Sequence, residues 1–214
     1  MDVLDNYKKA WKNQPEEQNK HSAKEIYKLA HSKSSSIVKW IFIIGILEFL
    51  FWSALNFVIP DSFYQVYEDL NLTGFLKVFV VLHYIIIAIF LYLFYNNHQR
   101  VSLTDSTRKL MKNILRIRKT VKYYVFYNLA TVFLISIVLN VVMFSDSDKL
   151  MQTMNPDNLA IDMSQIITIT IISQVVALII ILVFLWLFYK LVYGILLRKL
   201  NKNYKELARL DALN

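Results

Sequence analysis

The sequence predicts an all-α protein with a four-transmembrane-helix bundle, and three observations support this prediction. Of its 214 residues, 56% are hydrophobic, and only three glycines and three prolines occur. Four long apolar segments follow one another along the chain. Lysines and arginines gather on alternate sides of these segments. Such a composition favours helices over a transmembrane β-barrel, whose strands of about ten residues alternate apolar and polar side chains.

Each apolar segment is long enough to cross a bilayer. The predicted spans are residues 37–59, 74–95, 123–144 and 165–189. A helix rises about 1.5 Å per residue, so each segment covers a hydrocarbon core of about 30 Å. Residues 1–36 are too polar to open a signal peptide, and we therefore expect the first span to stay in the protein.

The positive charges predict the orientation. Of 24 lysines and arginines, eight lie between Lys8 and Lys39, eight between Arg100 and Lys122, and five between Arg198 and Arg209. The connections 60–73 and 145–164 are acidic instead. The positive-inside rule therefore places both termini and the central connection in the cytoplasm. We interpret the net charge of +8 as this orientation signal, with attraction to anionic lipid headgroups, and not as a nucleic-acid site.

The N-terminal arm, residues 1–36, is expected to form two short cytosolic helices. The first carries an apolar stripe at helical spacing, a candidate partner-binding surface made of Val3, Leu4, Tyr7 and Trp11. The alternative is that this stripe rests on the membrane interface or on other cytosolic helices. The second helix opens with the capping pattern of Ser22 and Glu25 and leads into the first span, with Ile26, Leu29 and Ala30 on one face.

Two further cytosolic helices are expected. Residues 102–122 form a basic helix with Ser102 as its cap and a heptad-like apolar seam of Leu110, Ile114, Ile117 and Val121. Residues 194–214 form a C-terminal helix that continues the apolar pattern of the fourth span through Leu191, Ile195, Leu196, Leu200, Leu207 and Leu210. We expect these extensions to pack with the arm as a cytosolic stalk.

Aromatic residues mark the predicted cytoplasmic boundary of the membrane. Trp and Tyr collect at such interfaces because their rings are amphipathic. The expected belt consists of Trp40, Tyr95, Tyr123, Tyr124, Tyr127, Trp186, Tyr189 and Tyr193.

Three polar residues are expected at nearly the same depth in the membrane: Glu48, His83 and Gln174. Ionisable groups inside spans are costly and usually face the interior of the protein. One interpretation is a proton or ion site, with Glu48 as acceptor and His83 as its partner. A second is a structural clamp, in which Glu48 hydrogen-bonds His83 and fixes the packing of the helices. The third alternative is that these residues make no contact with one another.

Motifs for catalysis are absent from the sequence. There is no P-loop, no G-x-S-x-G, no kinase signature and no zinc-binding histidine spacing, and cysteine does not occur. We therefore expect no enzymatic activity, no cofactor and no metal site. Ser173 and Ala177 are small residues four positions apart, a spacing found where membrane helices pack closely. A homo-oligomer that forms through this spacing is therefore one alternative.

A family resemblance rests on residues 25–28, 31–44 and 47–49, and on the opening from Leu4 to Lys12. In these segments the first 55 residues resemble a family of four-span inner-membrane proteins of flavobacteria and related Bacteroidota. Such proteins are sometimes labelled carotene monooxygenases, a label that implies a soluble iron-containing β-propeller and that nothing in this sequence supports. The resemblance further implies genes beside those of extracytoplasmic-function sigma factors, as for an anti-sigma-like regulator.

The leading hypothesis is thus a non-enzymatic regulatory or scaffold protein that binds a cytosolic partner, with a sigma factor as the candidate. The second is a small proton- or ion-coupled transporter or channel subunit that uses Glu48 and His83. The third is an accessory subunit that stabilises a larger membrane complex.

Overall fold

The computed structural model describes residues 23–55, 57–60, 62–69, 71–104, 106–145 and 162–212. Helices make up nearly all of these residues, and the described ranges contain no β-strand. The helices are α2 (Ala23–Leu55), α3 (Ser62–Asp69), α4 (Thr73–Ser102), α5 (Thr107–Ser145) and α7 (Met163–Asp211). The all-α prediction is confirmed for this part of the chain.

Four of these helices are long and apolar enough to cross a membrane: α2, α4, α5 and α7. They contain 33, 30, 39 and 49 residues, whereas a bilayer requires about 20. The second helix expected in the arm is the first part of α2, which runs without a break from Ala23 into the apolar segment. Helix α2 ends at Leu55, so the prediction that the first helix continues to Ile59 was wrong.

The short helix α3 was not predicted and lies in the connection between α2 and α4. It ends at a Schellman motif, in which the N–H of Leu72 donates to the carbonyl of Tyr67 at 2.8 Å and that of Asn71 to Glu68 at 2.9 Å. Asn71 has a φ of 55°, a left-handed conformation that asparagine tolerates better than most residues. The motif turns the chain into α4.

The boundary between α4 and α5 differs from the prediction. Ser102 is the last residue of α4 and does not cap the next helix, which begins at Thr107. Asn113 of α5 donates to the carbonyl of Arg100 at 3.2 Å and to the hydroxyl of Thr104 at 2.9 Å. These bonds satisfy groups that the end of α4 leaves without helical partners.

Side chains of α2 donate hydrogen bonds to backbone carbonyl groups at the end of α4. The Tyr27 hydroxyl donates to the Thr104 carbonyl at 2.7 Å, and His31 Nε2 donates to the Val101 carbonyl at 2.8 Å. The first part of α2 is therefore tied to the α4–α5 turn. Its buried side chains there include Ala30, as expected, whereas Leu29 is exposed and Ile26 only half-buried.

The seam predicted for the basic helix is confirmed. Leu110, Ile114, Ile117 and Val121 are all fully buried, with basic residues on the other faces of α5. Heptad spacing keeps one side of a helix against its neighbours over many turns. The neighbours contribute buried side chains from every other long helix: Ala30, Val38 and Ile41 of α2, Phe94 and Val101 of α4, and Leu200 and Leu207 of α7.

The apolar pattern predicted for the C-terminal part of helix α7 is confirmed only in part. Leu200 and Leu207 are buried as predicted, Leu196 and Leu210 are half-buried, and Leu191 and Ile195 are exposed, by 63% and 46%. The other buried positions are Tyr189, Tyr193 and Asn203. The prediction followed the leucines and isoleucines, but the actual contact face includes tyrosine and asparagine, because both find hydrogen-bond partners inside the protein.

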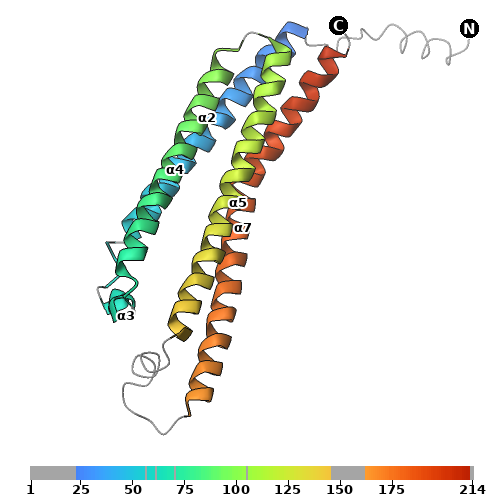
Figure 1. The fold of residues 1–214 in the computed structure, drawn as a ribbon. Coiled ribbons are helices and arrows are strands. Elements are labelled where there is room, and N and C mark those ends of the chain that lie inside the picture. Colours follow the sequence, from blue (N-terminus) through green and yellow to red (C-terminus); the bar gives the residue numbers. More distant parts are fainter. Residues whose placement is uncertain are drawn as a thin grey trace, which may run out of the picture.

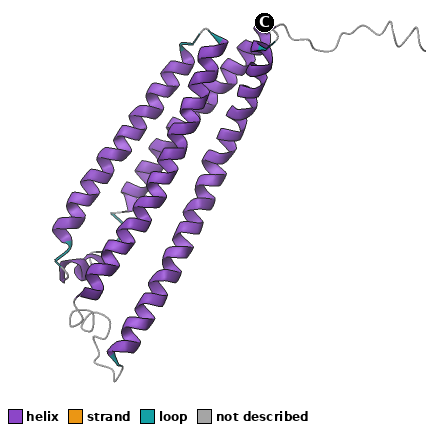
Figure 2. Ribbon diagram, turned by 45° about the vertical axis from the view of Figure 1, so that its right-hand side comes forward, coloured by secondary structure: helices purple, strands orange, loops and turns teal. Residues whose placement is uncertain are grey.

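The four long helices lie side by side as two pairs, α2 with α4 and α5 with α7 (Figure 1). The pairs approach each other at the end where α2 begins and α7 ends, and they separate toward the end that carries α3. Figure 2 shows the same long helices from a second direction, all running along the length of the molecule.

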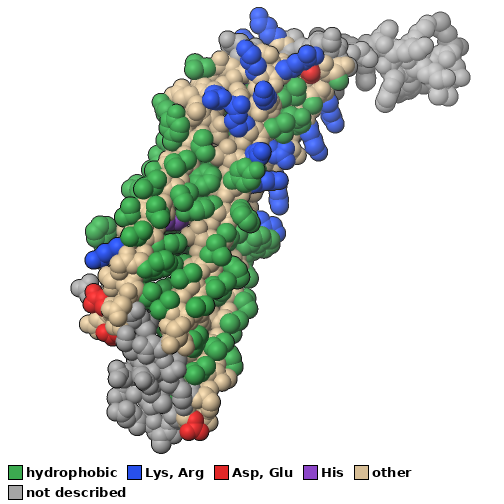
Figure 3. Space-filling view, in the orientation of Figure 1, with side chains coloured by type: hydrophobic (Ala, Val, Ile, Leu, Met, Phe, Trp, Pro, Cys, Tyr) green, Lys and Arg blue, Asp and Glu red, His purple; other side chains and the backbone are tan. Residues whose placement is uncertain are grey.

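Charge and hydropathy change along this length. In Figure 3, lysines and arginines gather mainly at the end where the pairs meet, acidic side chains lie mainly at the opposite end, and hydrophobic side chains cover much of the surface between them. Residues as apolar as Val78, Phe126 and Ile180 are more than 60% exposed there. A surface of this kind is suited to contact with lipid hydrocarbon chains and not with water.

Gly45 sets the distance between α2 and α4. A Cβ atom at this position would lie 3.1 Å from Leu91 Cδ2 and 3.3 Å from Phe94 Cδ2, closer than ordinary van der Waals contact. The two backbones can approach because glycine has no side chain, as at other small-residue contacts between membrane helices.

Replacing Gly45 by Ile should push α2 and α4 apart and lower the free energy of unfolding by about 1–3 kcal/mol, the usual cost of overpacking. The measurement is the melting temperature of the purified protein in mild detergent. Gly194→Ile is the control, because a Cβ there would meet only Lys190 Cγ at 3.9 Å. Equal effects of the two substitutions would show that Gly45 does not govern the contact.

Candidate functional site

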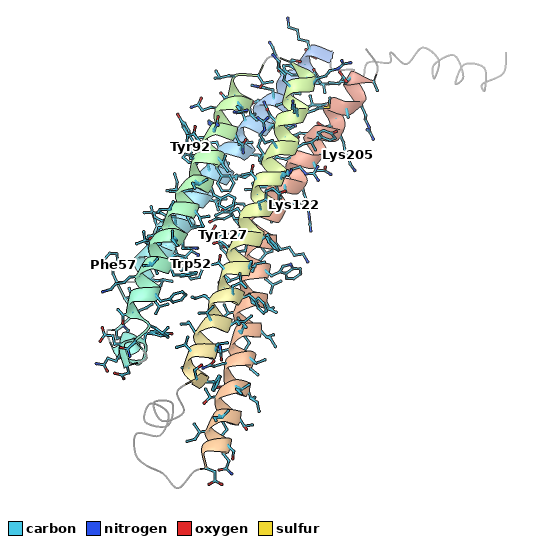
Figure 4. All side chains as sticks on the ribbon, in the orientation of Figure 1. Trp52, Phe57, Tyr92, Lys122, Tyr127 and Lys205 are labelled. Carbon is cyan, nitrogen blue, oxygen red and sulfur yellow. The ribbon has the colours of Figure 1, made fainter. Side chains whose placement is uncertain are left out.

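The candidate site is a cavity of about 420 Å³ between the two helix pairs. All four long helices line it, and most of the lining side chains are apolar or aromatic. Trp52 of α2 and Tyr127 of α5 are labelled in this region in Figure 4, on facing sides of the space between the pairs. The polar lining residues among those described are Glu48, His83, Asn128 and Thr131, together with three tyrosines.

Glu48 lies at the end of the cavity where the pairs meet. Its side chain is only 5% exposed. The Tyr189 hydroxyl donates to Glu48 Oε1 at 2.6 Å, and the Tyr193 hydroxyl donates to Oε2 at 2.9 Å. Both tyrosines come from α7, one turn apart, so the carboxyl group joins the first long helix to the last. Each of its oxygens has a fixed partner, which holds the group in one orientation.

Aromatic rings surround the two tyrosines. Tyr124 of α5 lies edge-on to Tyr189 and Tyr193, with ring centroids 6.2 Å and 5.8 Å away. Phe90 and Phe94 of α4 lie edge-on to Tyr124, each at 5.3 Å. Such edge-to-face pairs stabilise beyond the area that they bury. The cluster therefore fixes the hydroxyl groups that contact Glu48.

His83 lines the same cavity but has a different partner from the one predicted. Its Nδ1 shares a hydrogen bond of 3.0 Å with the Tyr127 hydroxyl, and the two rings stack with centroids 5.6 Å apart. In the described part of the chain, no hydrogen bond joins His83 to Glu48. The clamp between these two residues that the sequence suggested is therefore wrong in its partners. Ring contacts lead from His83 through Tyr127, Phe90 and Tyr124 to Tyr189, which donates to Glu48.

Gln174 does not belong to this site. Its side-chain amide donates to Met143 Sδ at 3.2 Å, which links α7 to α5 within one helix pair. Equal depth in the membrane thus did not imply contact, because depth says nothing about the direction in which a side chain leaves its helix. The predicted partner-binding residues Val3, Leu4, Tyr7 and Trp11 lie outside the described residues.

Sequence reasoning missed the role of the tyrosines. Tyr124, Tyr189 and Tyr193 were assigned to an interfacial belt, but all three are buried inside the protein. Of the other five belt residues, Tyr127 is half-buried and four are exposed: Trp40, Tyr95, Tyr123 and Trp186. A signal was present, since Tyr124 continues the heptad spacing of the seam from Leu110 to Val121.

Chemically, the site combines a carboxyl group with an apolar cavity. The carboxyl group can accept a proton or pair with a cation, and the hydroxyl groups on both oxygens keep it in place. Ionisable groups within helices that can span a membrane usually mark functional sites or specific pairing between helices.

A family model described as a domain of unknown function, DUF8845, matches residues 24–212. The chain belongs to this family. The match includes all four long helices and the Glu48 site, and it begins after the segment from Val3 to Trp11. No curated protein and no solved structure matches the chain.

Removing one of the tyrosine hydroxyl groups that donate to Glu48 should weaken the link between α2 and α7. We expect Tyr189→Phe and Tyr193→Phe each to lower the free energy of unfolding in detergent by about 1 kcal/mol, a typical net value for one hydrogen bond. In a Glu48→Leu background, each loss should shrink, because the acceptor is gone. Tyr92→Phe is the control, since Tyr92 is exposed and points away from the cavity in Figure 4. An equal effect of all three tyrosine substitutions would contradict the assignment.

Proposed function

We propose that the chain is a multi-pass protein of the bacterial inner membrane, a four-span bundle with both termini in the cytoplasm. The four apolar helices and the separation of basic from acidic ends support this orientation. In this arrangement the basic end of the molecule, where the helix pairs meet, is cytosolic. The acidic connection that contains α3 faces the periplasm.

Its proposed role is that of a non-enzymatic regulator or scaffold for a cytosolic partner. One observation carries this proposal: the most completely buried seam of the described residues lies at the basic end, beyond the predicted spans. Helix α5 begins at Thr107, 16 residues before the predicted span at Tyr123, which is about 24 Å of helix. Helix α7 continues past Tyr189 to Asp211, which is about 33 Å.

Polar contacts support a rigid cytosolic stalk. Asn203 of α7 donates to the Ser34 hydroxyl of α2 at 3.0 Å, with both side chains buried. Asn97 of α4 donates to the Thr120 hydroxyl of α5 at 3.2 Å. Buried polar pairs of this kind favour one alignment of the helices over others. A scaffold needs such a fixed alignment to hold a partner in one geometry.

The docking element that we propose is the apolar stripe of Val3, Leu4, Tyr7 and Trp11, by helix-in-groove contact. A sigma factor is the candidate partner on the basis of the family resemblance. An amphipathic stripe with a tryptophan is a common form of anchor, because Trp buries a large apolar area.

Trp11→Ala should therefore reduce capture of the cytosolic partner at least about tenfold, as loss of an aromatic anchor does. The measurement is quantitative mass spectrometry after mild-detergent purification of the tagged full chain from its own membranes. Trp40→Ala is the control, because Trp40 is an exposed tryptophan on the membrane-spanning part of the chain. If both variants recover the same proteins in the same amounts as the wild type, the docking proposal is wrong.

A second candidate function is a small proton- or ion-coupled transporter or channel subunit. The observation that favours it is the cavity that reaches Glu48 from between the helix pairs, with His83 on its wall. A carboxyl group that faces such a cavity can exchange a proton with a bound ligand.

On this second proposal, Glu48→Gln should abolish a proton-dependent flux in reconstituted vesicles, because the amide accepts no proton at neutral pH. A pH-sensitive dye inside the vesicles reports the flux. Asn128→Ala, which alters another polar lining residue but keeps the carboxyl group, is the control. A flux that persists in Glu48→Gln would exclude this carboxyl group from coupling.

A further inference from the structure

We infer that the cavity between the helix pairs binds one lipophilic organic cation, whose positive charge pairs with Glu48. This inference names a ligand class for the second of the two proposed functions. It rests on that proposal in one respect, that the cavity is the binding site. It does not require that the ligand be transported.

The sign of the charge follows from the lining. Glu48 brings a carboxyl group into a wall that is otherwise apolar, aromatic or uncharged, apart from the imidazole of His83, among the described residues. An ionised carboxyl group in apolar surroundings is very costly unless a positive charge compensates it. A cation beside Glu48 supplies that compensation, and the low dielectric constant strengthens the attraction between the two charges.

The chemistry of the walls selects an organic cation over a metal ion. Ca²⁺ takes six to eight oxygen ligands, and Mg²⁺ retains several waters in nearly octahedral geometry. The walls of the cavity instead present the rings of Phe49, Trp52, Phe79 and Tyr84. Aromatic faces attract ammonium and other organic cations, and Trp does so best. The same rings bury the apolar part of the ligand.

The size and access of the cavity fit such a ligand. Its volume of about 420 Å³ lies within the range of small-molecule sites, which are mostly apolar with a few polar groups. Trp52, Ile59 and Val80 line it and are each 42% exposed. These side chains therefore place one side of the cavity at the surface that we assign to the bilayer.

The carboxyl group of Glu48 is also held in position before a ligand binds. Tyr189 and Tyr193 hold the two oxygens of Glu48, and the ring of Tyr124 supports both tyrosines. A carboxyl group that is already oriented loses little conformational entropy when the ligand arrives.

The test is binding of tetraphenylphosphonium to the purified full chain in mild detergent, measured by isothermal titration calorimetry. Tetraphenylborate, an anion of the same shape, is the matched probe for charge. We expect one tetraphenylphosphonium per chain and at least about tenfold weaker binding of tetraphenylborate, because its charge would repel the carboxylate. Glu48→Gln should weaken tetraphenylphosphonium binding at least about tenfold, whereas Glu48→Asp, which keeps the charge, should retain part of it.

A second pair of variants tests the cavity without touching Glu48. Val132→Trp fills the space between the helix pairs and should abolish binding. Leu134→Trp places the same ring on the exposed side of α5 and should leave binding unchanged. Equal binding of both probes, or wild-type binding by both Glu48→Gln and Val132→Trp, would overturn the inference and indicate a site for lipid chains. Binding without flux in vesicles would keep the inference and reject the transport proposal.

Discussion

The buried carboxyl group of Glu48 is the contact on which the arrangement of the helices most depends. It accepts hydrogen bonds from Tyr189 and Tyr193, residues 141 and 145 positions away in the sequence. This contact joins α2 to α7 and so closes the two helix pairs into one unit. Carboxyl burial without partners would be costly, so the tyrosines and their supporting rings must be in place when the helices assemble.

On either side of Glu48 the molecule is built differently. Toward the basic end, heptad seams on four helices exclude solvent, and buried polar pairs such as Asn203 with Ser34 set their alignment. Toward the acidic end, the pairs separate and enclose a cavity lined by all four helices. The first region has the stiffness that a scaffold requires, and the second has the space that a ligand requires. The two proposed functions use different parts of one fold.

The repeat of apolar residues in α5 could be predicted from the sequence because it depends on one helix alone. The seam from Leu110 to Val121 is visible as a repeat, and burial follows from the repeat. The hydrogen-bond donors to Glu48 could not be predicted in the same way. His83 and Gln174 were chosen for their depth, but a side chain at the right depth can leave its helix in any direction. Tyr189 and Tyr193 were read as interfacial, because tyrosine is suited both to a membrane boundary and to a buried hydrogen bond.

The sequence alone determined that the chain is helical, that four segments can span a membrane, and where the basic and acidic ends lie. These properties depend on composition and on periods of a few residues, which each helix expresses independently of its neighbours. Only the tertiary structure decided that the helices pair as α2 with α4 and α5 with α7, that the pairs separate around a cavity, and that tyrosines hold Glu48. Those features depend on how the helices are rotated about their axes. That rotation is set by the fit of side chains from segments more than a hundred residues apart.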